Sequence, residues 1–286
     1  HLYYGRKTDG VMDYLLTYAD RGFSGNPHDT GNDRTYSLDV LPQEFPCRLT
    51  GDFRSPVLDL VNADGSFGCD LRYQGYEICD GKYNLKGLPA VYAAEEEAQT
   101  LIIYMKDQVT GLQVELLYGV LPEYDVITRS AKVINTEEDK IRLTKAQAAC
   151  IDFVHGEFDV ISFYGRHAME RNMQRTSVGH GAFVIGSRRG TSSHQYNPMM
   201  ILAEKETTED AGTCYGMSFV YSGGFKAEVE KDQFGQTRIQ MGLQEEQFSY
   251  PLKKGEEFVI PEVILTCSNQ GLEKLSQNLQ RCIRKN

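Results

Sequence analysis

The chain has 286 residues, of which 41% are hydrophobic and 24% charged, and its formal net charge is −10. These values are typical of a globular protein with one large domain or two small ones, and all-β sandwiches of this length often form a single domain. No apolar run is long enough to span a bilayer, and the negative charge argues against nucleic acid as a partner because a phosphate backbone would be repelled.

The start of the chain has little periodic pattern. Residues 1–5 contain no initiator Met and are typical of the end of a hairpin whose partner lies outside this sequence, so we expect a piece of a longer polypeptide. Residues 5–40 are predicted to form a long loop, rich in turn formers at 21–29. Loops of this length in a compact domain are usually functional or disordered. Asp20 and Arg21 lie at its centre.

Alternating apolar and polar residues predict strands through most of the remaining chain. The clearest are at 100–106, 111–118, 126–133, 140–144, 216–221 and 225–230. Turn-forming pairs such as Asp64-Gly65, Asp80-Gly81 and Lys254-Gly255 separate such runs. This spacing favours antiparallel sheets stacked face to face, without the alternation of strand and helix that a Rossmann or barrel enzyme requires.

Two polar segments interrupt the strand pattern. Residues 187–198 crowd small and polar side chains together, and such groups must bond to one another, to a neighbouring domain or to a polar ligand such as a sugar. We expect His194 to bond within this loop. Arg166, His167, Glu170 and Arg171 lie close together in the other segment, either as an internal salt-bridge cluster or as a polar rim that contacts a ligand or another domain.

One helix is predicted, at residues 271–285. Its apolar residues share one helical face, and Ser268 or Asn269 is placed to cap its start. The residues of that face are Leu272, Leu275, Leu279, Cys282 and Ile283.

Motifs for catalysis are absent from the sequence: there is no G-x-S-x-G, H-E-x-x-H, Walker loop or dinucleotide fingerprint. We expect His180 to lie in an ordinary turn and residues 232–238 to join two strands. The acidic run 95–97 is expected to be a solvated loop, because a glycosidase needs two carboxylates that face each other across a bond.

The seven cysteines are odd in number, contain no C-x-x-C and lie mostly in apolar runs, so they are expected to be reduced, buried thiols of a cytosolic protein that bind no metal.

A series of short motifs carries a family resemblance. They occupy residues 33–39, 51–56 (Gly-Asp-Phe-Arg-Ser-Pro), 87–90, 124–130, 170–171, 187–198, 220–223, 232–235 and 261–263. In this order they resemble the amino-terminal domain of bacterial α-galactosidases of glycoside hydrolase family 36. Each motif is weak alone, but the series covers nearly the whole chain and is specific.

The resemblance implies an all-β fold, a large antiparallel β-supersandwich like that of galactose mutarotases, at residues 1–267. It also implies a helical linker at 268–286 that leads to a (β/α)₈ barrel outside this sequence. In the family the barrel hydrolyses α-linked galactose with retention and supplies both catalytic aspartates, so no catalytic residue is assigned here. Neutral glycoside cleavage by two carboxylates needs no cofactor. The implied partners are a galactoside substrate, the barrel and further copies in a tetramer.

The resemblance also implies two substrate-binding residues. In the family an Asp that precedes an Arg-x-Phe-Ser-x-Asn-Pro stretch hydrogen-bonds the galactose, and Asp20 holds that position before residues 21–27. An ionised carboxylate accepts hydrogen bonds from two sugar hydroxyls. A second family segment, Gly-Ala-Trp-x-Arg-Glu-Arg, matches residues 165–171, where His167 stands in the place of the Trp. This departure either keeps a flat ring beside the sugar or remodels the subsite.

Three functions remain open at this point. The first is the accessory domain of a cytosolic α-galactosidase that acts on melibiose- and raffinose-type sugars. The second is a stand-alone carbohydrate-binding or mutarotase-like module, although the sequence offers no paired His and Glu signature. The third is a purely structural interaction domain. Binding of galactose by the chain alone would favour the second.

Overall fold

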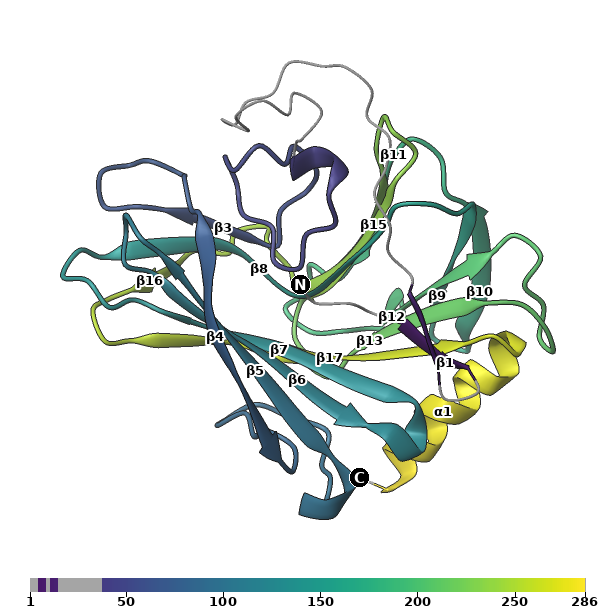
Figure 1. Ribbon diagram of the computed structural model, residues 1–286. Coiled ribbons are helices and arrows are strands. Elements are labelled where there is room, and N and C mark those ends of the chain that lie inside the picture. Colours follow the sequence, from purple (N-terminus) through teal and green to yellow (C-terminus); the bar gives the residue numbers. More distant parts are fainter. Residues whose placement is uncertain (1–4, 9–10, 15–37, 286) are drawn as a thin grey trace.

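Two antiparallel sheets stacked face to face make up the fold (Figure 1). The computed structural model describes residues 5–8, 11–14 and 38–285. The larger sheet has nine strands. In spatial order they are β10 (Met169–Ser177), β9 (Phe158–Arg166), β12 (Tyr196–Glu204), β13 (Cys214–Phe219), β17 (Glu257–Ser268), β7 (Val126–Ile134), β6 (Gln113–Leu121), β5 (Gln99–Asp107) and β4 (Leu71–Asp80).

The smaller sheet lies across the middle of the larger one. Its strands are β11 (Gly181–Gly186), β14 (Phe225–Lys231), β15 (Thr237–Leu243), β8 (Ile141–Phe153) and β16 (Tyr250–Leu252), and β3 (Leu58–Val61) also pairs with β8. Three short 3₁₀ helices are η1 (Leu38–Val40), η2 (Glu95–Glu97) and η3 (Pro122–Tyr124). All named strand pairs of the two sheets are antiparallel, which confirms the predicted all-β supersandwich.

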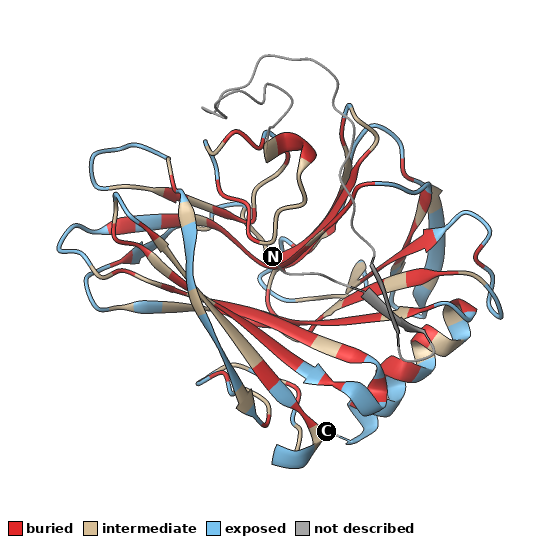
Figure 2. Cartoon of the chain, viewed as in Figure 1, coloured by how far each residue is buried: buried red, intermediate tan, exposed pale blue. Residues whose placement is uncertain are grey.

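The main core fills the space between the sheets. On β6 the residues Val114, Leu116 and Tyr118 alternate with others along the strand and face this core. Leu143 of β8 and Met241 of β15 face them from the smaller sheet and are buried completely. Figure 2 shows the buried residues concentrated in these central strands, whereas the edges of the larger sheet are mostly exposed. Burial of alternating apolar side chains therefore holds the two layers together.

The single α-helix in the described part, α1 (Gly271–Lys285), covers the outer face of the larger sheet. Leu275, Leu279 and Cys282 are buried against strand residues such as Ile264, which confirms the predicted helix and most of its apolar face. Ile283, which lies on the same helical face, remains 55% exposed. No helix in residues 38–285 has both the length and the apolar character to cross a membrane.

The predicted loop over 5–40 is wrong in part. β1 (Gly5–Thr8) and β2 (Val11–Tyr14) form a two-stranded antiparallel sheet, with Gly5 opposite Tyr14 and Thr8 opposite Val11. The separate prediction that residues 1–5 end a hairpin stays a prediction, because residues 1–4 lie outside the described part of the chain. Strand segments of only four residues carry too few alternations to separate them from a turn-rich loop.

Candidate functional site

His167 lies at the tip of the hairpin that joins β9 and β10. Met169 pairs with Arg166, so His167 and Ala168 form a two-residue turn, and Ala168 has a φ of 61°. Such short turns require left-handed backbone because it matches the twist of the strands. The side chain of His167 is exposed. It is thus available to a ligand or another protein surface.

The charges around His167 do not neutralise one another. Arg166 Nη2 lies 3.0 Å from the sulfur of Met169, and Glu170 Oε1 accepts a hydrogen bond of 2.9 Å from the amide of Ala168. No ion pair joins Glu170 to Arg166 or Arg171 among the interactions of the described residues. The internal salt-bridge interpretation is therefore wrong, and the polar-rim interpretation remains.

The second polar segment lies beside this turn. Tyr196 pairs with Tyr164 across β12 and β9, and the amide of Gly165 donates to the carbonyl oxygen of Gln195 at 3.4 Å. These contacts bring residues 164–165 next to residues 195–196, although strands β10 and β11 lie between them in the sequence. We call the surface formed by residues 164–171 and 187–195 the rim. It gathers Arg, His, Glu and Ser side chains at one edge of the larger sheet.

Hydrogen bonds within the rim and to neighbouring Ser222 satisfy part of its polarity, which is one of the three alternatives that the sequence left open. Ser187 Oγ donates to the carbonyl of Thr191 at 2.5 Å, and both Thr191 Oγ1 and the amide of Ser192 donate to the carbonyl of Ser222. His194 is different: it is exposed, and no hydrogen bond joins it to another described residue, so its predicted bond within the loop is wrong. Residues 196–198 belong to β12 rather than to the loop.

The remaining polar motifs have structural roles. His180 Nδ1 lies 2.8 Å from the carbonyl oxygen of Asp232, in a bend before β11, as expected for a turn residue. Residues 232–236 join β14 to β15, as predicted, while Thr237 and Arg238 already belong to β15, and Asp232 Oδ1 accepts from the amides of Phe234 and Gln236. The acidic run 95–97 is mostly exposed, as predicted, but it forms η2 rather than a loop.

All seven cysteines are reduced, and five of them are buried, as predicted. Burial raises the pKa of Cys214 to about 12 and thereby disfavours the thiolate that would bind a metal or act as a nucleophile. No group of three His, Cys, Asp or Glu side chains within the described residues is arranged to hold a metal ion.

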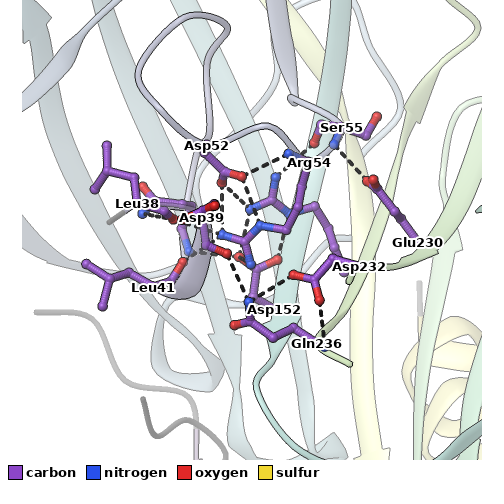
Figure 3. A network of polar contacts seen from close by, with 12 residues as sticks. Leu38, Asp39, Leu41, Asp52, Arg54, Ser55, Asp152, Glu230, Asp232 and Gln236 are labelled. Atoms are coloured by element: carbon purple, nitrogen blue, oxygen red, sulfur yellow. Dashed lines mark hydrogen bonds and ion pairs between the residues drawn. The ribbon is translucent and has the colours of Figure 1, made fainter. Parts of the chain in front are cut away.

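A buried network of charges covers the outer face of the smaller sheet, and sequence reasoning missed it (Figure 3). Arg238 of β15 binds both oxygens of Asp152 on β8, at 2.7 and 2.8 Å, and one oxygen of Asp52 at 2.7 Å. Arg54 binds both oxygens of Asp52 at 2.9 Å. All four side chains are at least 96% buried. Two arginines are thus neutralised by two carboxylates.

The charges of this network determine the pKa of Asp152. Burial raises that pKa, because a buried carboxylate loses its hydration. The charge and hydrogen bonds of Arg238, together with the charge of Arg54, lower the pKa by more than burial raises it. The pKa of Asp152 therefore lies below its ordinary value. Burial lowers the pKa of Arg238, and the neighbouring carboxylates of Asp152 and Asp52 raise it well above the usual range. Both groups stay ionised, so neither serves as a proton donor or acceptor near neutral pH.

The network also anchors η1. Arg54 Nη2 donates to the carbonyl oxygens of Leu38 and Leu41, at 3.1 and 2.7 Å, and Gln236 Nε2 donates to that of Asp39 at 2.9 Å. These bonds hold the chain at the C-terminal boundary of the segment in which Asp20 was predicted to bind sugar. Asp20 itself lies outside the described residues, so the structure does not relate it to His167.

Comparison with known proteins identifies the family. The profile of the Glycosyl hydrolase family 36 N-terminal domain matches residues 1–253. The bifunctional α-galactosidase/sucrose kinase AgaSK of Mediterraneibacter gnavus is 62% identical over 284 residues, which are 99% of this chain and 30% of that protein. The solved galactosidase domain of AgaSK superposes with a TM-score of 0.93, and this chain covers 40% of it.

Solved structures of AgaA, a family 36 α-galactosidase from Geobacillus stearothermophilus, match equally completely. Variants in complex with stachyose and with raffinose are 40% identical, with TM-scores of 0.92 and 0.93, over 100% of this chain and 40% of theirs. The chain thus spans well under half the length of these relatives. Because the profile covers most of the sequence and the fold agrees throughout, this chain belongs to the glycosyl hydrolase family 36 N-terminal domain family.

Proposed function

We propose that this chain is the N-terminal domain of a retaining α-galactosidase that hydrolyses terminal α-linked galactose from melibiose- and raffinose-type oligosaccharides. The observation that carries the proposal is the match along the whole chain, at 40% identity and a TM-score of 0.93, to an α-galactosidase solved in complex with raffinose. That this chain covers 40% of the solved α-galactosidase supports its assignment to one domain of a larger enzyme.

In this proposal the domain shapes the active-site pocket, and the two catalytic aspartates lie in a barrel outside this sequence. The buried carboxylates support that division of roles. Asp52 and Asp152 are held in ion pairs with arginines, whereas a retaining glycosidase needs one accessible carboxylate nucleophile and one carboxylic acid about 5 Å apart. Residues 1–267 are the supersandwich domain, and residues 268–286 connect it to the barrel.

Asp20 and His167 are the proposed contacts to the sugar. Asp20 accepts hydrogen bonds from galactose hydroxyls, and His167 borders the sugar with a flat ring that is more polar than an indole. The exposure of His167 at a hairpin tip supports this role, because the imidazole is free to meet a surface contributed by another domain or copy. The enzyme is further proposed to be a cytoplasmic homotetramer that needs no cofactor.

Hydrolysis of raffinose and melibiose by the complete enzyme tests the proposal. We expect Asp20→Ala to reduce kcat/KM by the equivalent of about 1–3 kcal/mol, because a polar sugar contact is left unpaired. His167→Ala, measured in the same assay, is expected to reduce kcat/KM less, since a ring contact contributes less than a charge-assisted hydrogen bond.

Asp29→Ala is the matched control, because it removes a carboxylate from the same segment outside the proposed contact. Equal kinetics of Asp20→Ala and Asp29→Ala would remove Asp20 from the substrate site. Absence of galactoside hydrolysis by the complete enzyme, together with calorimetric binding of galactose to it, would instead identify a carbohydrate-binding module.

A further inference from the structure

Strand β4 leaves a long, unpaired edge on the larger sheet. It has ten residues and pairs with β5 on one side, and no other described strand pairs with it. Figure 1 shows it at the opposite end of the sheet from β10. Backbone amides and carbonyls along a free edge are ready to pair with another strand, and exposed edges of this length are usually shortened or covered.

The side chains of β4 are unusually apolar for a free edge. Tyr73, Tyr76 and Ile78 are 61%, 63% and 62% exposed. Tyr76 lies opposite Ile103 and Ile78 opposite Leu101, residues that pack against the main core. These three side chains therefore extend the inner face of the larger sheet beyond the smaller sheet that covers its middle. A contiguous apolar face of this kind marks an interaction surface.

The charges at the ends of β4 complement each other under two-fold symmetry. Arg72 lies near its start and Asp80 at its end. An antiparallel pairing of two β4 strands centred on Tyr76 brings Arg72 of each copy beside Asp80 of the other, opposite it or one residue away across the bulge between Tyr73 and Gly75. A pairing centred on Glu77 would instead oppose two carboxylates. The charge pattern thus selects the first register.

We propose that β4 pairs with β4 of a second copy and joins the two larger sheets into one continuous sheet. The contact is isologous: each copy contributes the same edge, the same apolar face and one member of each of two equivalent ion pairs, Arg72 to one and Asp80 to the other. Arg72 is free to re-pair, because its present partner Asp70 is also on the surface and exposed ion pairs contribute little. This proposal specifies one interface of the oligomer proposed above but does not depend on the catalytic assignment.

A charge-reversal series in the complete protein, measured by sedimentation velocity, tests the interface. Arg72→Asp and Asp80→Arg each place like charges together and are expected to weaken self-association at β4 by about tenfold or more. The double variant exchanges the charges and is expected to restore the mass of the unmodified protein. Lys253→Asp is the matched control, because it breaks another surface pair at a similar exposure, 68% against 64% for Arg72.

Hydrogen exchange gives a second, independent measurement. Amides of β4 that face the free edge are expected to exchange faster on dilution and in Arg72→Asp, while those of central strand β7 stay protected. Unchanged mass and exchange in both single variants, or failure of the double variant to recover, overturns the proposal. Loss of galactosidase activity with intact association would count against the proposed function alone, so the two failures are distinguishable.

Discussion

At the residue scale, three of the family motifs contain a buried charge: Arg54 in 51–56, Arg129 in 124–130 and Glu262 in 261–263. Arg54 belongs to the network on the smaller sheet. Arg129 lies 3.1 Å from Glu44, and Glu262 lies 2.5 Å from the ammonium group of Lys82, with that pair almost wholly buried. Removal of one partner from such a pair leaves an uncompensated charge in a low-dielectric interior. A substitution at one of these charged positions is therefore expected to lower the stability of the folded protein.

Asp152→Asn tests this explanation. The variant keeps the shape of the side chain but leaves Arg238 with only Asp52 as a counter-ion, so we expect the free energy of unfolding in urea to fall by about 3–5 kcal/mol. Asp59→Asn is the control, since Asp59 pairs with Arg48, whose side chain is 52% exposed, and the expected loss is about 1 kcal/mol or less. Equal losses in the two variants would show that burial of an ion pair does not increase its contribution to stability.

At the element scale, helix α1 begins in an unusual way. Ser268 Oγ accepts from the amide of Gln270, as the predicted cap suggests, but the first amides of the helix bond to a neighbouring turn. Those of Gly271, Leu272 and Glu273 donate to the carbonyl oxygens of Gly212, Thr208 and Glu209. Backbone carbonyls thus replace the usual side-chain cap. This close approach fixes where the helix lies against the outer face of the larger sheet.

Gly271 is required for that approach. Its φ is +80°, and a Cβ there would lie 2.3 Å from the carbonyl oxygen of Glu209. We expect Gly271→Ala to destabilise the protein by about 2 kcal/mol or more, measured by denaturant unfolding. Gly255→Ala separates the two contributions, because Gly255 has a φ of +74° and a Cβ added there would meet nothing within 4 Å, so only the backbone cost, about 1 kcal/mol, remains. A similar cost at both sites would exclude the steric contribution.

At the scale of the whole molecule, buried and partly buried carboxylates make the free energy of unfolding depend on pH in the acidic range. The pKa values of Asp152 and Glu245 are lowered: burial raises each, and the neighbouring cations, Arg238 for Asp152 and Lys226 with Lys145 for Glu245, outweigh it. A carboxylate with a lowered folded-state pKa contributes stability that is present above its unfolded pKa, about 4, and is lost as pH falls through the folded value.

We therefore expect the contribution of these carboxylates to the free energy of unfolding to be nearly constant above about pH 5. Below that pH the free energy of unfolding is expected to decrease steadily. Urea titrations from pH 7 to pH 3 measure this decrease. In Asp152→Asn the decrease is expected to be smaller, because one titrating group with a lowered pKa has been removed. The same pH dependence in both proteins would assign acid unfolding to other carboxylates.

Local patterns were sufficient for part of the fold. The strands predicted at 126–133 and 225–230 match β7 and β14 closely, because alternation over a half-buried strand is a local property. The strand predicted at 140–144 is in fact β8, which continues to Phe153. Its second half contains Ala146, Ala148 and Ala149, and alanine carries little strand preference. Packing between the sheets, rather than propensity, keeps that segment extended.

By itself, the sequence determined the all-β class, the position of helix α1 and, through the order of its motifs, the family. The class and the helix follow from periodicity, which depends on neighbours in the chain, whereas the family follows from the resemblance of the motifs. Only the tertiary structure decided that Asp52 pairs with Arg238, 186 residues away, that residues 164–171 and 187–195 form one rim, and that Asn278 is buried in place of Ile283. Such contacts depend on how the strands are ordered in the two sheets, which no local pattern encodes.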